Sequence, residues 1–196
     1  MKHVFVETNV LVDLLRPSPS KDADALYARN DNVDLRLYVP WCSQSEAWRT
    51  LNRVISDDLG FVDAMMRFAV RRWTADRTLF EKVEIDKLRA LAKADHAAAL
   101  TTLATRIQAT MASVAQIDPT PTVVARTLQI FTVKALKPFD EMVLGAVLSK
   151  ASELFAAGER ELYFCNLDGD LASQHSALAA EYGACGLTVR QDFNVP

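Results

Sequence analysis

The chain has 196 residues, of which 50% are hydrophobic and 24% are charged, and this is the ordinary composition of a folded globular protein. The 22 Lys and Arg residues and the 25 Asp and Glu residues give a net charge of −3, which excludes a uniformly basic nucleic-acid-binding protein. The length favours one domain with an elaboration.

Membrane, secretion and disulfide signals are all weak in this sequence. No apolar run approaches the ~20 residues of a membrane helix, and the first residues lack the ~7–15-residue apolar stretch of a signal peptide. The three cysteines, Cys42, Cys165 and Cys185, form no CxxC pair, which fits neither a disulfide framework nor a structural zinc site. We therefore expect a cytoplasmic protein with reduced, buried thiols and no membrane partner.

The first thirty residues predict a strand followed by two helices. Residues 3–6 form a short apolar run with β-branched and aromatic side chains, which is typical of a buried strand. Thr8 or Asn9 is the expected N-cap of a helix over residues 10–15. Apolar residues at helical spacing predict a second short helix over residues 21–30.

The next segment predicts a strand and the start of a helix. Residues 35–39 alternate in polarity and end at Pro40, which is typical of a strand. Ser43 and Glu46 match the S-x-x-E capping box, so we expect a third helix to begin at Ser43. In that arrangement the Glu46 carboxylate accepts a hydrogen bond from the backbone of Ser43.

A long helical segment is expected over residues 57–118. It is rich in alanine, and its apolar residues recur at helical spacing, so we expect two or three helices, one of them long. We interpret this segment as an amphipathic helical insertion within a single domain that spans residues 1–196. A dedicated binding arm is the less favoured alternative.

The last third of the chain alternates helices and strands. The expected elements are helices over residues 123–133, 138–157 and 172–182 and strands over residues 161–165 and 187–190. Gly158 and Gly183 are expected to end the second and third of these helices. Apolar strands that alternate with helices predict an α/β fold, a three-layer sandwich with a small parallel sheet.

Acidic residues fall where the predicted strands end. Glu7 ends the first strand, Glu46 lies just after the second, and Asp168 and Asp170 follow the strand that precedes the last one. Asp140 opens the helix that leads into that same strand. Because ligands of open parallel sheets bind outside the carboxyl ends of the strands, we expect these acids to meet at one edge.

The chemistry expected of such a group is metal binding. Like charges within ~4–6 Å raise one another's pKa values, and a cation removes that penalty. Oxygen ligands favour Mg²⁺ or Mn²⁺, and the acidic motifs contain no histidine that would favour zinc. A divalent ion of this kind activates water, so the hypothesis is hydrolysis of a phosphodiester.

Each acid also has a purely structural interpretation. Glu46 would cap its helix, and Asp140 would be a first-turn acid that the helix dipole favours. Asp168 and Asp170 would shape a turn around the glycine between them. The metal hypothesis depends on all these acids falling at the strand ends of one α/β pattern.

Taken in order, these motifs resemble those of PIN domains. Residues 4–15 look like the opening strand of that family and its Asp-Thr/Ser-Asn step. Glu46, within Cys-Ser-Gln-Ser-Glu-Ala, looks like the second acidic element, and Asp140 looks like the third. Residues 165–171, Cys-Asn-Leu-Asp-Gly-Asp-Leu, look like the fourth.

The resemblance covers residues 3–56 and about 120–192 and leaves the helical segment out. The chain departs from the family at the first acid, which is usually Asp and here is Glu7. That side chain is longer by one carbon, about 1.5 Å of reach. Because Mg²⁺ demands near-ideal geometry, the ion would shift or the site would prefer Mn²⁺.

The resemblance implies a Mg²⁺- or Mn²⁺-dependent ribonuclease that cleaves single-stranded or structured RNA. For many bacterial members it implies a VapC-like toxin that a small antitoxin protein holds inactive, and it implies a homodimer. Carried over position by position, the catalytic metal ligands would be Glu7, Glu46, Asp140 and Asp168, with Asp170 as an auxiliary metal ligand and Asn166 or Thr8 as polar supports.

A single-strand nuclease also needs cations along its substrate groove. Arg16, Arg49 and Lys137 each lie close in sequence to an acidic element and are the expected phosphate contacts. Their alternative role is that of ordinary solvated surface cations.

Two other functions stay open. Glu7 in place of Asp motivates a catalytically weak PIN-like module that binds RNA or protein without cutting it. A phosphatase with an aspartyl nucleophile is least favoured, since the first strand ends in Glu-Thr-Asn. An ATPase has no support, because the sequence contains no G-x-x-x-x-G-K loop.

Overall fold

A computed structural model gives the fold and describes residues 1–16, 18–30, 34–75, 82–133, 136–171 and 176–196. The chain divides into two compact units. The larger unit comprises Met1–Trp48 and Gln108–Pro196, and the smaller unit comprises Arg49–Ile107. In the described ranges, no helix is both long and apolar enough to cross a membrane.

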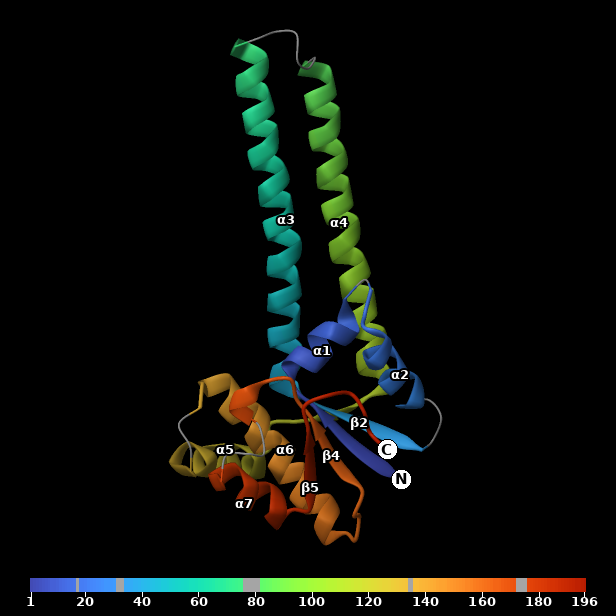
Figure 1. The fold of residues 1–196 in the computed structure, drawn as a ribbon, viewed down its shortest axis with the longest axis vertical. Coiled ribbons are helices and arrows are strands. Elements are labelled where there is room, and N and C mark those ends of the chain that lie inside the picture. The colour runs from blue at the N-terminus through green and yellow to red at the C-terminus, as the bar shows by residue number, and fades with distance from the viewer. Residues whose placement is uncertain (17, 31–33, 76–81, 134–135, 172–175) are drawn as a thin grey trace. The chain divides into compact units, whose positions relative to one another are not determined.

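The described residues of the larger unit form a five-stranded sheet in which every pairing is parallel (Figure 1). The strands are β1 (Lys2–Val6), β2 (Leu35–Pro40), β3 (Ala115–Ile117), β4 (Leu162–Cys165) and β5 (Leu187–Arg190), in the spatial order β3-β2-β1-β4-β5. The strands are therefore parallel with β1 at the centre, and all of them end at the same edge.

Successive side chains of each strand point to opposite faces of the sheet, and helices cover both faces. One face carries Phe5, Tyr38 and Phe164, which pack with helices α5 (Pro121–Val133), α6 (Pro138–Ala156) and α7 (Ser176–Ala184). The other face carries Val6 and Leu37, which line an apolar pocket with residues of α1 (Thr8–Leu15) and α2 (Lys21–Asn30). The predicted α/β sandwich of three layers with a parallel sheet is thus confirmed.

Two long helices, α3 (Trp41–Ala75) and α4 (Lys82–Ser113), supply the residues of the smaller unit. The expected capping box is wrong, because α3 begins directly after Pro40 and both Ser43 and Glu46 lie inside the helix. Ser43 is fully buried there. The S-x-x-E pattern therefore lies within the first two turns of α3 and does not mark the start of the helix.

Other local expectations also needed correction. Glu7, rather than Thr8 or Asn9, is the N-cap of α1. Strand β3 lies in a segment that we expected to be helical, and it is held by pairing with β2. Gly158 ends α6 as expected, with a φ of 97°.

The end of the last helix also differs from the expectation. Gly183 lies inside α7, and the positive φ of 63° belongs to Gly186 instead. The expected start of this helix, residues 172–175, lies outside the described residues. The left-handed conformation that ends a helix is thus found three residues later than the sequence pattern placed it.

Candidate functional site

The centre of the sheet places two of the polar motifs side by side. Val6 pairs with Cys165, so Glu7 and Asn166 leave adjacent parallel strands at the same edge. The backbone N–H of Glu7 donates to the carbonyl of Cys165 at 3.3 Å. Parallel pairing of β1 with β4 therefore brings together segments that are about 160 residues apart in sequence.

Glu7 is buried, with 4% of its surface exposed, and both of its carboxylate oxygens are hydrogen-bonded. The backbone N–H of Asn9 donates to Oε2 at 2.9 Å, and that of Leu167 donates to Oε1 at 2.9 Å. Glu7 thus caps α1 and also connects the start of α1 to the loop that follows β4. Each oxygen keeps a second lone pair, so these contacts still permit a further ligand.

Glu46 reaches the same region from the first turns of α3. The hydroxyl of Thr8 donates to Glu46 Oε2 at 2.7 Å. This contact replaces the one that the capping box predicted, and it orients the carboxylate toward the start of α1. Thr8 thus holds the Glu46 side chain in place.

Asp140 lies in the first turn of α6, which Lys137 precedes as the N-cap residue. Its Oδ2 atom is buried and has no hydrogen-bond partner among the described residues. Burial raises the pKa of Asp140, and the charges of Asp168, Glu46 and Asp170 raise it further, whereas Lys137 lowers it. A buried carboxylate oxygen without a donor is a group that a water molecule or an ion would satisfy.

The pKa of Glu7 is also shifted by neighbouring acids. Burial raises the pKa of Glu7, the hydrogen bonds from Asn9 and Leu167 oppose this, and Asp168 and Asp140 add to the increase. The acids that the sequence singled out thus lie near enough for their charges to raise the pKa values of Glu7 and Asp140 at this edge of the sheet.

Asp168 and Asp170 lie in the turn between β4 and α7. The backbone N–H of Asp170 donates to Asp168 Oδ1 at 2.8 Å, which is the ordinary turn chemistry that the sequence also allowed. Asp168 is partly buried, and Asp170 is exposed. In this conformation no group of three Asp, Glu, His or Cys side chains within the described ranges is arranged to hold a metal ion.

Asn166 adds an unsatisfied amide to this edge. It is 0% exposed, and neither its Oδ1 nor its Nδ2 has a hydrogen-bond partner among the described residues. Leaving such a group unsatisfied costs about 1–3 kcal/mol. The sheet edge therefore holds buried polar groups that a water molecule or an ion would satisfy.

The three candidate phosphate contacts have different surroundings. Lys137 acts electrostatically on Asp140. Arg16 is exposed, and its Nη1 lies 3.7 Å from Asp13 Oδ1. Arg49 is exposed and is the first residue of the smaller unit.

The backbone amide of Leu167 is the site contact that sequence reasoning missed. Any residue supplies a backbone N–H, so no side-chain pattern could have marked it. The nearest signal was the resemblance of the Asn-Leu-Asp step to a family motif.

The cysteines offer no reactive thiolate near this edge. Burial raises the pKa of Cys42 to about 11 and that of Cys165 to about 12, so both are protonated thiols at neutral pH. All three cysteines are free and buried, as the sequence predicted.

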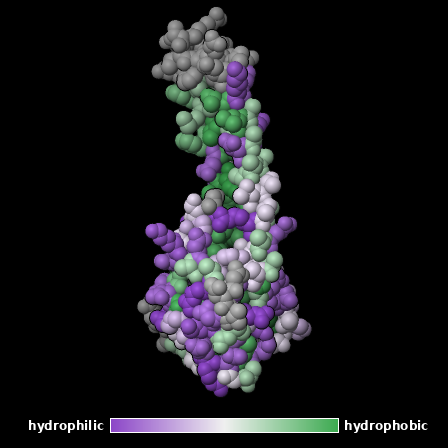
Figure 2. Space-filling view, turned by 90° about the vertical axis from the view of Figure 1, so that its right-hand side faces the viewer, coloured by the Kyte–Doolittle hydropathy of each residue, from purple (hydrophilic) through white to green (hydrophobic). Residues whose placement is uncertain are grey.

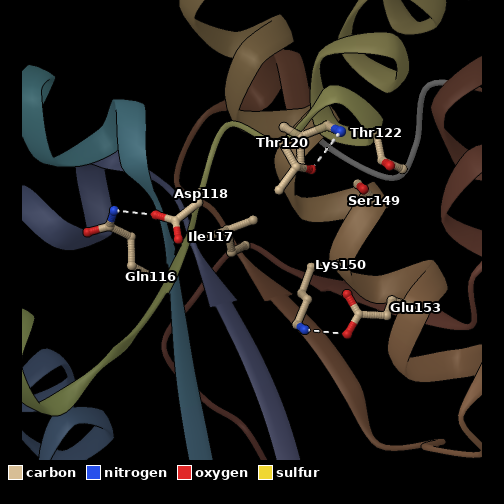
Figure 3. A pocket seen from close by; sticks show the side chains of 9 residues that line it. Gln116, Ile117, Asp118, Thr120, Thr122, Ser149, Lys150 and Glu153 are labelled. Carbon is tan, nitrogen blue, oxygen red and sulfur yellow. Dashed lines mark hydrogen bonds and ion pairs between the residues drawn. The ribbon is translucent and has the colours of Figure 1, made fainter.

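A separate polar pocket of about 430 Å³ lies beside β3, the start of α5 and the second half of α6 (Figure 3). Figure 3 shows Lys150 and Glu153 pointing toward one another, with Lys150 Nζ 2.6 Å from Glu153 Oε1. On the opposite wall, Gln116 Nε2 donates to Asp118 Oδ1 at 2.6 Å. These groups satisfy one another, and none of the five acids lines the pocket.

Comparison with known proteins gives sparse results. No family model matches the chain, and no curated protein matches it. Among solved structures, FitAcB from Neisseria gonorrhoeae aligns at 12% identity and a TM-score of 0.39, covering 95% of this chain and 95% of that one. FitAB bound to an IR36 DNA fragment aligns at 12% identity and a TM-score of 0.40, covering 98% and 97%. With TM-scores below 0.5, these likenesses carry no inference about activity.

Proposed function

We propose that Glu7, Glu46, Asp140 and Asp168, with Asp170, bind a divalent cation, Mg²⁺ or Mn²⁺, and that the chain is a PIN-like nuclease of single-stranded RNA. The observation that carries this proposal is the buried Oδ2 of Asp140, which has no hydrogen-bond partner among the described residues, together with the neighbouring acids whose charges raise the pKa values of Asp140 and Glu7. Repulsion of this kind is relieved by a bound cation.

The donor chemistry fits such an ion. Carboxylate and amide oxygens are the ligands that Mg²⁺ and Mn²⁺ prefer, and both kinds are present with unmet hydrogen-bonding capacity at Asp140 and Asn166. The side chains would have to move closer to chelate an ion, since no three of the described acids do so as they stand. Asp170 is exposed and Asp168 is only partly buried, so neither side chain is enclosed by its surroundings.

Hydrogen bonds hold some of the proposed metal ligands in place and leave others able to change position. Glu7 is fixed by two backbone donors, and Glu46 is fixed by the hydroxyl of Thr8. Lys137, beside Asp140, supplies a positive charge that would attract a phosphate. When bound, a divalent ion supplies an activated water and neutralises charge on the phosphodiester.

A toxin role with a small antitoxin partner is part of the proposal and rests on the order of the motifs. In a bacterial host, we expect induced expression of the chain to arrest growth. The Asp140→Asn variant should then permit growth at the same expression level. Growth arrest by both proteins would contradict this role.

A catalytically weak binding module is the second candidate function. Two observations favour it: both Glu7 oxygens already accept backbone hydrogen bonds, and the described acids do not chelate an ion as they stand. Such a module would bind RNA or protein without cutting it.

Cleavage of a labelled single-stranded RNA in the presence of Mn²⁺ or Mg²⁺ separates the two functions. We expect Asp140→Asn and Asp168→Asn to reduce the rate on the order of 10²–10³-fold, because each removes a metal ligand. Asp22→Asn, which changes an exposed acid on α2, is the matched control and should cut as fast as the unaltered chain. Equal rates for all four proteins would contradict the assignment.

A further inference from the structure

The smaller unit differs from the rest of the chain in its charge. The 11 Lys and Arg residues and the 8 Asp and Glu residues of the segment 49–107 give it a net charge of +3. The 11 basic and 17 acidic residues outside this segment give a net charge of −6. A basic segment in an otherwise acidic chain favours an anionic partner for that segment.

Within this unit, α3 and α4 form a hairpin whose contacts define its sides (Figure 1). His96 Nδ1 on α4 lies 3.3 Å from the carbonyl oxygen of Ile55 on α3. Asp63 Oδ1 on α3 lies 3.9 Å from Arg89 Nε on α4. Side chains three or four residues apart are neighbours on a helix. Residues at this spacing from Asp63 and Arg89, further from the α3–α4 contact, therefore lie on one side of the hairpin.

Six cations lie on that side. On α3 they form two pairs with a spacing of four residues, and the pairs are 18 residues apart, which is five full turns and roughly 27 Å. On α4 there are two cations four residues apart, and one of them is the partner of Asp63. These six residues, the basic side of the hairpin, are Arg49, Arg53, Arg67, Arg71, Arg89 and Lys93.

Acids on the same side cancel only part of this charge. They are Asp57, Asp63 and Asp86, each within four residues of a cation of its own helix, so the basic side keeps a net charge of +3. Neither Arg53 nor Arg67 forms an ion pair with a described carboxylate. Both side chains are exposed, so their charges are available to a ligand.

An exposed aromatic ring lies beside these cations. Phe68 is 61% exposed and precedes Arg71 by three residues, so the two side chains are neighbours on the helix surface. Figure 2 shows hydrophobic side chains next to hydrophilic ones at the surface of the hairpin. Proteins that bind single-stranded nucleic acid combine cations along the phosphate backbone with rings on which bases stack. This combination fits a nucleic acid better than an acidic peptide, which has no bases.

We propose that the basic side of the hairpin binds the phosphate backbone of single-stranded RNA and that Phe68 stacks on one of its bases. The choice of RNA rests on the proposed nuclease function, whereas the anionic character of the ligand rests on the charge of the hairpin itself. Arginine binds phosphate directly, so this contact needs no metal ion. The helical segment then acts as a binding arm, the role that its sequence favoured less than that of a structural insertion.

Fluorescence anisotropy of a labelled oligouridylate of about 16 nucleotides tests the proposal in EDTA, where metal-dependent cleavage cannot occur. We expect the double variant Arg53→Gln, Arg67→Gln to weaken binding on the order of tenfold. It should also reduce the slope of log K against log salt by about 1.4, because two phosphate contacts are lost.

The matched control is the double variant Lys21→Gln, Arg36→Gln. It removes two exposed cations of the larger unit and changes the net charge equally, and it should bind as the unaltered chain does. Equal affinities and equal salt slopes of the two double variants would overturn the proposal. Circular dichroism would establish that both proteins keep their helical content.

A single substitution tests the stacked base. Phe68→Ala should weaken oligouridylate binding about fivefold or more. Phe131→Ala on α5 removes a similarly exposed ring, at 64%, and should have no effect. Polyglutamate should displace the RNA only at a large excess of charge. Displacement at equal charge, with no effect of Phe68→Ala, would show a surface for any polyanion, such as an acidic protein, and would overturn the assignment to RNA.

Failure of this proposal is distinguishable from failure of the nuclease. Binding in EDTA that depends on the hairpin cations, without cleavage in Mn²⁺, would contradict the nuclease and support the binding arm. Cleavage in Mn²⁺ by a chain whose binding in EDTA is insensitive to Arg53→Gln, Arg67→Gln would overturn the binding arm alone.

Discussion

The two units of this chain are unusual in opposite ways. The larger unit buries the aromatic side chains of its sheet, Phe5 and Phe164, completely, and it also buries polar groups such as Glu7 and Asn166 at one sheet edge. The smaller unit exposes two thirds of Phe61. The larger unit therefore holds buried polar groups that a ligand would satisfy, whereas the smaller unit leaves large apolar side chains of α3 at its surface.

Deletion of one aromatic ring in each unit should give the largest difference between them. Phe164→Ala in the sheet should lower the free energy of unfolding by about 3–5 kcal/mol, because it leaves a cavity in a packed core. Phe61→Ala on α3 should change the unfolding of the monomer by about 0.5 kcal/mol or less. Denaturant unfolding at low protein concentration measures both, and similar losses would contradict the contrast.

Two helical glycines offer a matched pair for packing density. At Gly145 on α6 an added Cβ would lie 2.7 Å from the Cα of Thr127 on α5, so Gly145→Ala should destabilise the larger unit by about 1–3 kcal/mol. At Gly60 on α3 no atom lies within 4 Å. Gly60→Ala should therefore stabilise the helix by up to about 1 kcal/mol. Melting curves of the two variants should shift in opposite directions.

The pH dependence of stability should arise from the acidic edge of the larger unit. The pKa values of Glu7 and Asp140 are raised in the folded chain above their ordinary values of 4.5 and 3.8. The folded state therefore binds these protons more tightly, and without metal its stability should fall as pH rises from about 4 through the raised values. Asp140→Asn should reduce this slope.

Urea unfolding between pH 4 and pH 8 measures the pH dependence. Asp22→Asn, on an exposed helix, is the control and should keep the slope of the unaltered chain. Mg²⁺ or Mn²⁺ at neutral pH should recover the stability that ionisation removes. A stability that rises steadily with pH in metal-free buffer would contradict this account.

The smallest effects should come from single polar contacts. Thr8→Ala removes a part-buried hydrogen bond of 2.7 Å to Glu46 and should lower the unfolding free energy by about 1 kcal/mol. Asp63→Asn removes the 3.9 Å ion pair with Arg89 on the hairpin, and its effect should be about 0.5 kcal/mol or less. Thermal unfolding should rank the two variants in this order.

The sequence predicted the parts of the fold whose local pattern agrees with their tertiary setting. Residues 3–6 lie in β1, and residues 162–165 form β4; both segments are rich in apolar side chains and are largely buried in the sheet. Strand β3 was missed because three residues carry too little pattern, and its pairing with Tyr38 decides its structure. Ser43 and Glu46 misled because a capping-box pattern also fits inside a helix.

The sequence allowed the residues of the acidic edge to be predicted, but not the contacts that these residues make. The strand ends indicated Glu7 and Asp168, and the start of a helix indicated Asp140; in the structure the charges of Asp168 and Asp140 act on Glu7. The backbone donor at Leu167 and the orphaned oxygen of Asp140 depend on three-dimensional packing, which no local pattern encodes. The exposure of Phe61 and Phe68 on α3 could not be predicted for the same reason, because helical periodicity does not say which apolar side chains are covered.

Calorimetric titration of Mn²⁺ into the metal-free chain tests the central claim most directly. We expect saturable binding by the unaltered chain and by Asp22→Asn, and at least tenfold weaker binding by Asp140→Asn. Equal affinity of all three proteins, or no binding by the unaltered chain, would show that the acids at this sheet edge do not form a metal site.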